Sequence, residues 1–302
     1  MNKETKGTLL AFATAIISGI SIPLNKLFVV NMDPTVFTAV RGFIIGLIFI
    51  LLSWKTKKLR KDILEGQKWL YLVLIGIIGG GLAFLTYFHG LQLTTSSRGA
   101  FLHKTLPIYT TILAFIFLKE KIPKKQLIAL FLMIIGTIVI YLDKIQPSTF
   151  WSDPSFGDLL VIFATFLWAI ENTISKKVMI NGESNFVVSA ARMFIGSLFL
   201  FGVVILFGKI DVLLSLSTKQ IINLLVSTFI LLGYVYCWYS SIKLINVSKA
   251  TTILLISPVI SMILGVVIFS EPTPLLQIAG SILILSGSYL ISQVKSEFVE
   301  NV

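Results

Sequence analysis

The chain has 302 residues, of which 56% are hydrophobic and 13% are charged, and its mean hydropathy is +0.93. Soluble domains carry about 25% charged residues, so this composition excludes an ordinary soluble protein. The single cysteine, Cys237, excludes an internal disulfide and a cysteine-rich metal site. Because unpaired backbone groups are costly in hydrocarbon, long apolar runs predict membrane-spanning helices, and we expect an all-α integral membrane protein.

Ten apolar runs follow one another along the chain, and we interpret each as a transmembrane helix. The first run, from Gly7, continues past Ile22 without a small-residue cleavage site, so it predicts a retained helix and not a signal peptide. The ten runs are Gly7–Val30, Pro34–Trp54, Lys68–Leu91, Gly99–Leu118, Pro123–Leu142, Gly157–Lys177, Asn185–Phe207, Gln220–Leu244, Ala250–Phe269 and Pro274–Ser292.

Residues 98–140 recur as residues 249–291 at a constant offset of 151. The matched residues are Pro107 with Pro258, Glu120 with Glu271, Pro123 with Pro274, Gln126 with Gln277 and Gly136 with Gly287. The first run of each half aligns at an offset of 150, which pairs Gly7 with Gly157 and Lys26 with Lys176, and Arg41 aligns with Arg192. The chain is therefore a duplication of five helices. We expect a first repeat at 1–142, an external linker at 143–156 and a second repeat at 157–302.

An odd number of spans per repeat predicts that the second copy is inserted upside down. Loop charge supports this inversion, since basic residues gather on the cytoplasmic side. With both termini placed there, that side takes most of the Lys and Arg, whereas the other holds only Arg98, Lys144, Lys209 and Lys219. We therefore predict a multi-pass plasma-membrane protein with both termini in the cytoplasm. The net charge of +11 reflects topology, and we expect no nucleic-acid partner.

These features resemble the EamA-type branch of the drug/metabolite transporter superfamily. The resemblance covers essentially the whole chain, and its carriers are the two Pro…Glu…Pro…Gly hairpins, Trp168-Ala169, Arg41 and Arg192. It implies ten helices in two inverted five-helix repeats around a central cavity, which move small organic metabolites, such as amino acids, by alternating access and often outward. The hairpin Glu and Pro residues are interpreted as architectural features and not as substrate ligands.

Ionisable side chains inside apolar helices are the first candidates for a site, because a charge there costs at least about 2.5–3.5 kcal/mol. His103 and Lys104 lie in the fourth run, and Glu171 and Asn172 lie midway along the sixth. The equivalent positions in the other half hold Leu254, Leu255, Ser21 and Ile22. Charge that is present in only one copy favours a specialised role over a packing role shared by both.

Helical spacing places Trp168, Glu171, Asn172 and Ser175 on one stripe of the sixth run, and we expect this stripe to face a polar path between the repeats. The matching stripe of the first run holds Ser18, Ser21 and Asn25 beside a kink at Pro23, and aromatic residues of the third and eighth runs complete the site. The predicted substrate-binding set is Lys104, His103, Glu171, Asn172, Trp168, Ser21, Asn25, Tyr87, His89, Tyr236 and Trp238.

Each candidate also has a structural interpretation. Glu171 pairs with Lys104 in one alternative, and the two histidines, His89 and His103, are packing residues in another. The arginines of the second and seventh runs snorkel or form structural pairs, and Lys26 and Lys176 reach the membrane interface. The helix-eight aromatics anchor the interface, the Gly79-Gly80-Gly81 run packs helices closely, and the Ser and Thr residues of the ninth run bond to their own helix.

The preferred hypothesis is a transporter in which Lys104 and Glu171 hold the substrate, an amino acid placing its carboxylate on the former and its amine on the latter. Glu171 is the candidate for proton coupling, since no nucleotide-binding motif supplies energy. We expect no cofactor, no metal and no catalytic residue; the partners are a small-molecule substrate and the lipid bilayer, and the oligomeric state is left open. The alternative is an intramembrane enzyme using the buried His, Lys and Glu groups, against which the absence of HExxH and GxSxG motifs argues.

Overall fold

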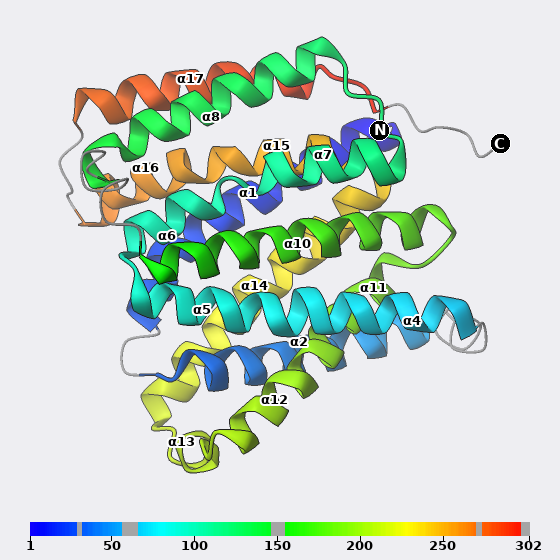
Figure 1. The fold of residues 1–302 in the computed structure, drawn as a ribbon, viewed down its shortest axis with the longest axis vertical. Helices are drawn as coiled ribbons and strands as arrows, with labels where there is room; N and C mark the ends of the chain where they lie inside the picture. The colour runs from blue at the N-terminus through cyan, green and yellow to red at the C-terminus, as the bar shows by residue number, and fades with distance from the viewer. Residues whose placement is uncertain (29–31, 56–65, 146–154, 270–273, 297–302) are drawn as a thin grey trace.

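The computed structural model describes residues 1–28, 32–55, 66–145, 155–269 and 274–296, and within these ranges it contains helices and no strand. Most helices run across the view of Figure 1, a few cross it obliquely, and together they form one bundle. The expected all-α architecture is therefore confirmed.

The first half of the chain supplies α1 (Lys3–Phe28), α2 (Pro34–Lys55), α4 (Gly66–Leu74), the π-helical η1 (Ile75–Leu82), α5 (Ala83–Leu93), α6 (Ser96–His103), α7 (Leu106–Leu118) and α8 (Lys124–Ile145). The second half supplies α10 (Phe156–Ile180), α11 (Asn185–Ala190), the π-helical η2 (Ala191–Ile195), α12 (Gly196–Leu206), α13 (Ile210–Leu214), α14 (Thr218–Leu244), α15 (Val247–Ile253), the 3₁₀ segment η3 (Leu254–Ile256), α16 (Ser257–Phe269) and α17 (Leu275–Ser292). Because α8 continues to Ile145, the first three residues of the predicted linker are helical, and residues 146–154 lie outside the described part.

Nine stretches of the described chain are long and apolar enough to cross a membrane, which confirms a multi-pass membrane protein. They are Pro34–Trp54, Trp69–Leu93, Ser97–Leu118, Lys124–Leu142, Phe156–Ile180, Asn185–Leu206, Thr218–Leu244, Val247–Val267 and Leu275–Ser292. The helix α1 is not among them, although its 26 residues extend about 39 Å. The tenth span therefore stays a prediction.

Two runs expected to be continuous helices are interrupted, and the interruptions fall at equivalent positions. In the first half the chain turns at Lys104 and Thr105, between α6 and α7. There the N–H of Lys104 donates to Phe101 O at 2.8 Å and that of Thr105 to Leu102 O at 3.1 Å, so shorter bonds replace the α-helical ones. In the second half η3 takes the same place. The cause is the proline that follows each break, Pro107 or Pro258, since proline lacks an N–H and its ring clashes with the carbonyl four residues earlier.

The third and seventh runs also depart from a regular α-helix, because each contains a π-helical segment. These segments, η1 and η2, pack directly against one another in the middle of the bundle. π-Helical turns inside α-helices are frequent at functional sites. The region where η1 meets η2 is therefore a candidate location for a functional site.

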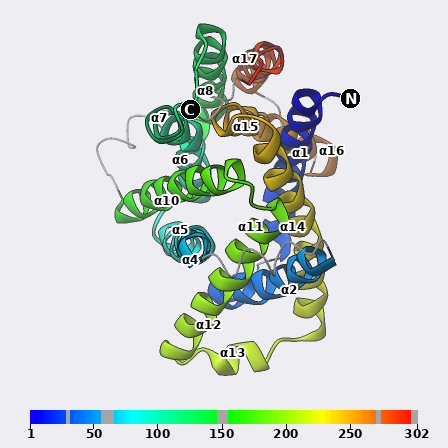
Figure 2. The same ribbon diagram turned by 90° about the vertical axis from the view of Figure 1, so that its right-hand side faces the viewer.

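Contacts in one half recur in the other, which relates the duplication to packing. Helices α8 and α17 lie side by side in Figures 1 and 2 and pack through small residues. A Cβ on Gly136 would lie 2.6 Å from Gly280 O, and one on Gly287 would lie 2.9 Å from Ala129 O. An offset of 151 converts the first contact into the second. The same holds where α1 meets the end of α14 and α10 meets the end of α5.

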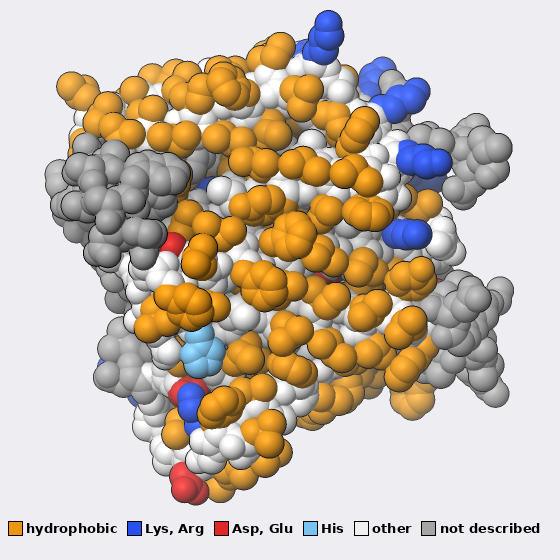
Figure 3. Space-filling model, viewed as in Figure 1, with side chains coloured by type: hydrophobic (Ala, Val, Ile, Leu, Met, Phe, Trp, Pro, Cys, Tyr) orange, Lys and Arg blue, Asp and Glu red, His pale blue; other side chains and the backbone are white. Residues whose placement is uncertain are grey.

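The start of α1 and the end of α17 lie at the same edge of the bundle, at the right of Figure 1. Figure 3 shows that most Lys and Arg side chains on this face gather along that edge, whereas the middle is covered by hydrophobic side chains. The unequal distribution of basic residues inferred from the sequence is therefore also visible on the folded surface.

Candidate functional site

The predicted polar stripe of α10 is buried in the centre of the bundle. Trp168 is 6% exposed, Asn172 is 3% exposed, and Glu171 and Ser175 are fully buried. These residues recur every three or four positions, so one side of the helix carries all of them. An acid at this depth requires partners from neighbouring helices.

Glu171 has such partners on one of its two carboxylate oxygens. Its Oε1 accepts hydrogen bonds from Ser175 Oγ and from Tyr239 OH on α14, each at 2.6 Å. Its Oε2 lies 3.8 Å from Nη1 of Arg192 and has no hydrogen bond. The carboxylate is therefore charge-balanced by Arg192 but only half hydrogen-bonded.

Arg192 comes from η2 and is 8% exposed. Its Nη1 donates to Tyr239 OH at 3.2 Å, and its guanidinium lies 5.8 Å from the ring centre of Phe84. Its Nε has no hydrogen-bond partner. Glu171, Arg192 and Tyr239 thus form a closed triangle that joins α10, η2 and α14, and we call it the central triad.

The structural alternative in which Glu171 pairs with Lys104 is wrong. The carboxylate faces Arg192, and the Nζ of Lys104 donates instead to Ser257 Oγ on α16 at 2.7 Å. Lys104 lies at the break between α6 and α7, so its 2.7 Å bond joins the two interrupted helices. The physical reason is competition, because the rigid guanidinium from η2 already occupies the space beside the acid.

Close helix packing accounts for the run Gly79-Gly80-Gly81, as expected. A Cβ on Gly79 would clash with the side chain of Glu171, and one on Gly80 would clash with the backbone carbonyl of Arg192. The indole N–H of Trp168 donates to Gly79 O at 3.0 Å. Because the glycines of η1 have no side chains, α10 and η2 can both pack closely against η1. This packing brings their charged side chains, Glu171 and Arg192, near each other.

An aromatic cluster lies next to the triad and consists of Trp168, Tyr87, His103 and Phe84. The ring centre of Trp168 is 5.2 Å from that of Tyr87, 5.1 Å from that of His103 and 5.3 Å from that of Phe84. These spacings suit edge-to-face and tilted ring contacts. Three of the predicted site residues are thus in mutual contact.

A second aromatic side chain reaches the stripe from α14. Trp238 is 1% exposed, and its indole N–H donates to Asn172 Oδ1 at 2.9 Å. The region around this stripe therefore contains an acid, two bases, an amide and several rings within an apolar bundle.

A model of the EamA-like transporter family matches residues 5–142 and 155–293 of this chain. The chain belongs to the EamA-like transporter family. The EamA-like chain is 28% identical over 291 residues to the uncharacterized transporter YyaM of Bacillus subtilis (strain 168), covering 95% of this chain and 92% of the relative. It is 26% identical over 252 residues to an uncharacterized transporter of Clostridium kluyveri, covering 82% and 80%.

A crystal structure of another protein matches the fold with a TM-score of 0.75 at 16% sequence identity, covering 94% of this chain and 95% of that chain. At this identity the match shows the shared fold alone. The expected resemblance to EamA transporters is confirmed, and the relatives are named as transporters without a stated substrate.

Several predicted site residues lie away from the centre of this EamA-like transporter. His89 is exposed on α5, and Tyr236 is 46% exposed on α14, where it stacks on Phe186. Ser21 is partly buried and bonds to its own helix, donating to Ile17 O at 2.6 Å. The side chain of Asn25 lies outside the described residues.

Two residues of the triad were not in the predicted set. Arg192 has a counterpart in Arg41, and this sharing favoured a structural interpretation. Arg41 indeed packs over Phe37 and donates to Ser227 Oγ at 2.6 Å, so the two arginines have different surroundings. Tyr239 carried no signal beyond membership of an aromatic run.

Several other buried charges sit at helix ends. Glu120 accepts hydrogen bonds from the backbone N–H groups of Val247 and Ser248 at the start of α15, at 2.8 and 3.2 Å, and from the Ser248 hydroxyl at 2.5 Å. The expected architectural role of this residue therefore has a physical basis, since a carboxylate offsets the free N–H groups of a helix start.

Lys176 does not reach the membrane interface, contrary to expectation. It is 1% exposed, and its Nζ donates to Ile242 O at 2.7 Å and Ile245 O at 2.9 Å. The ammonium thus binds carbonyl groups at the end of α14, which a cation favours. Lys249 is fully buried as well and donates to Glu4, Thr8 and Val294.

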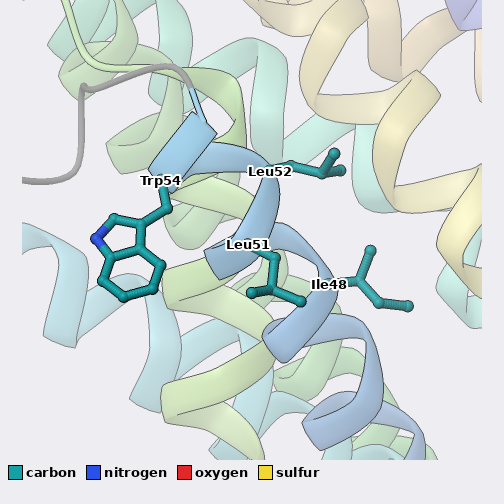
Figure 4. Close-up of a pocket in the computed structure, with 4 residues that line it drawn as sticks. All are labelled: Ile48, Leu51, Leu52 and Trp54. Atoms are coloured by element: carbon teal, nitrogen blue, oxygen red, sulfur yellow. The ribbon is translucent and has the colours of Figure 1, made fainter.

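The outer side of α2 carries an apolar hollow lined by Ile48, Leu51, Leu52 and Trp54 (Figure 4). Leu51 and Trp54 are 60% and 68% exposed. Such a surface suits contact with lipid chains and offers no charged side chain to a metabolite. Within the described ranges no group of three or more His, Cys, Asp and Glu residues could hold a metal ion.

Proposed function

We propose that this EamA-like protein is a secondary transporter that exports small organic metabolites, such as amino acids, across the plasma membrane. Two inverted five-helix repeats, residues 1–142 and 157–302, alternate access to a site between them, with both termini in the cytoplasm and α1 as the tenth span. The observation that carries the proposal is the pair of matched helix breaks joined by the bond from Lys104 to Ser257.

The breaks support transport because interrupted helices at the boundary of two repeats commonly line substrate sites in secondary transporters. The first break follows His103 and the second includes Leu255, which is the equivalent of Lys104 at an offset of 151. A broken helix leaves backbone groups free of intrahelical bonds, and these groups are tolerated inside a bundle only where protein or a cavity satisfies them. The proposed site therefore comprises Lys104, the aromatic cluster and the central triad.

Proton coupling is proposed for Glu171. It is the only one of the two equivalent positions that carries an acid, the other being Ser21, and one of its oxygens is free of hydrogen bonds. A proton on that oxygen would remove the charge that holds Arg192, and the contact between η1 and η2 would then rearrange. The sequence contains no nucleotide-binding motif, so a gradient is the proposed energy source.

Counterflow in proteoliposomes tests the transport proposal. Purified protein is reconstituted and screened with labelled amino acids, nucleosides, polyamines and sugar phosphates. We expect saturable exchange of at least one class. Absence of exchange together with hydrolysis of a tested compound would favour the enzyme alternative over a transporter.

The coupling proposal has its own variant. Glu171→Gln keeps an oxygen acceptor for Tyr239 but cannot release a proton, so we expect the pH dependence of transport to flatten. The control is Asp211→Asn, which changes an exposed acid on α13 and should keep the wild-type profile. A wild-type rate and pH profile in the Glu171→Gln variant would refute coupling through this residue.

The inversion is tested by labelling equivalent positions. Position 68, at the start of the third span, and position 219, at the start of the eighth, differ by 151 residues. Single cysteines at these positions, in a Cys237→Ser background, should react with an impermeant thiol reagent from opposite sides of the membrane. Reaction from the same side would contradict inverted repeats.

A further inference from the structure

The charges buried at the centre of the bundle do not balance. The central triad contains one acid and one base, Glu171 and Arg192, which neutralise each other across 3.8 Å. Lys104, which is 8% exposed, adds a second base, and within the described residues it forms no ion pair with a carboxylate. The proposed site therefore carries one uncompensated positive charge in an apolar bundle.

The ammonium of Lys104 is also short of hydrogen-bond acceptors. An ammonium has three N–H donors, and the part of the chain that the structure describes supplies one acceptor, Ser257 Oγ. The other buried lysines differ, because Lys176 donates to two carbonyl groups and Lys249 donates to a carboxylate, a hydroxyl and a carbonyl. Lys104 thus has unused capacity to bind an anion.

The surroundings of Lys104 favour a negative ligand. Both α7 and α16, each of 13 residues, begin at the breaks beside it, and the N-terminus of a helix carries a partial positive charge. The hydroxyls of Thr110 and Thr111 on α7 are buried and have no hydrogen-bond partner. Buried hydroxyls usually have partners, so these two, on the helix that begins beside Lys104, have hydrogen-bonding capacity left for acceptor oxygens.

The aromatic cluster borders this place on one side. His103, which directly precedes Lys104, packs edge-on against Trp168 at 5.1 Å between ring centres. A ligand whose acidic group lies on Lys104 would therefore have its remaining atoms against rings, which suits a planar apolar body.

We infer that Lys104 binds the carboxylate of a small organic anion that carries one net negative charge and a planar apolar body. The inference rests on the proposed function and narrows its substrate class. The bond to Ser257 is the ligand-free contact, and the carboxylate takes its place. A zwitterion split between Lys104 and Glu171 fits less well, because Arg192 already neutralises the acid.

Thermal unfolding of the purified full chain in detergent tests the inference without requiring transport. The probes are phenylacetate and its uncharged isostere phenylacetamide, with sodium chloride at the same ionic strength. We expect phenylacetate to raise the unfolding midpoint by several degrees, since ligand that binds only the folded state stabilises it. Equal shifts with phenylacetamide or chloride, or no shift with phenylacetate, would overturn the inference.

The variant is Lys104→Leu, which installs the residue found at the equivalent position 255 and is therefore compatible with this type of helix break. It should fold and lose the phenylacetate shift, with apparent affinity at least tenfold weaker. Lys176→Met is the matched control, because it removes another buried ammonium and should keep the shift. Loss of the shift in both variants, or in neither, would contradict a carboxylate site at Lys104.

Counterflow separates this inference from the transport proposal. Exchange of phenylacetate but not of phenylacetamide supports both. Exchange of phenylalanine without any binding of phenylacetate would support the transport proposal and refute the inference that Lys104 binds an organic anion.

Discussion

The buried charges near the helix ends differ from those at the centre of the bundle. Glu120 and Lys176 each bind at least two backbone groups, those of Glu120 at the start of α15 and those of Lys176 at the end of α14. Glu171 has one oxygen without a hydrogen bond, and Lys104 has a single hydroxyl partner. A charged side chain whose polar atoms bind backbone groups at a helix end stabilises the fold. A charged side chain that still lacks hydrogen-bond partners is available to bind a ligand or a proton.

Close packing against glycines is a second feature of the centre. A Cβ would meet the side chain of Glu171 at Gly79 and the backbone carbonyl of Arg192 at Gly80. Stability at the helix ends thus depends on hydrogen bonds, and stability at the centre depends on small residues.

Gly80→Ala should have the largest effect. The added methyl group would overlap the carbonyl of Arg192, a backbone atom that cannot move without displacing η2. We expect a loss above the roughly 3 kcal/mol typical of overpacking, seen as failure to obtain monodisperse protein in detergent. Gly202→Ala is the control, since nothing lies within 4 Å of its Cβ. Similar yields of both variants would show that the centre tolerates separation.

Glu120→Ala should cost about 3 kcal/mol, because it leaves two buried N–H groups and one hydroxyl without an acceptor. The measurement is the thermal unfolding midpoint in detergent, with Asp211→Ala as a control for the loss of an exposed acid. An unchanged midpoint would mean that water or another side chain replaces the carboxylate at α15.

Lys176→Met should cost about 2 kcal/mol, since it leaves two buried carbonyl groups at the end of α14 without their charged donor. The thermal midpoint again provides the measurement. Because the methionine fills a similar volume, a loss of stability reports the hydrogen bonds and not a cavity. An unchanged midpoint would mean that the hydrogen bonds of Lys176 do not stabilise the fold.

Lys104→Leu should instead stabilise the ligand-free protein by about 1 kcal/mol, because replacing a poorly compensated buried charge by an apolar residue is often favourable. If replacing Lys104 raises the unfolding midpoint and replacing Lys176 lowers it, the two buried lysines differ in whether their hydrogen bonds stabilise the fold. Destabilisation by Lys104→Leu as large as that by Lys176→Met would show that the bond to Ser257 is structural.

The duplication and the helices could be predicted from the sequence because both depend on short-range patterns. Matching residues at a fixed offset located the repeats, and three-to-four spacing located the polar face of α10. Helical spacing also separates two of the candidates from their neighbours in the predicted set. His89 lies two residues from Tyr87, and Tyr236 two from Trp238, so within each pair the side chains point to nearly opposite sides of a helix.

The pairing of Glu171 with Arg192 could not be predicted in the same way. Spacing says which residues share a face, but it does not say which neighbouring helix that face meets. The break after His103 did leave a signal in Pro107, three residues after Lys104. The equivalent proline, Pro258, marked the second break. Because the runs were defined by apolar character alone, the two helical segments on either side of each break were predicted as one helix.

Asp33→Asn should have the smallest effect, below about 1 kcal/mol, because its pair with Lys209 at 2.7 Å lies at the partly exposed rim. Burial alone would raise the pKa of Asp33, but hydrogen bonds from Lys209, Val36 and Thr35 together hold it below its usual 3.8. A pKa lowered by folding contributes stability above the usual pKa and loses it as the pH falls through the folded value. The midpoint of wild type should therefore exceed that of the variant at pH 7, and the difference should shrink below about pH 4. If the difference in unfolding midpoint between wild type and variant stayed constant down to pH 3, Asp33 would stabilise α2 without its charge. The hydrogen bonds of a charged group would then matter little at a site that water reaches.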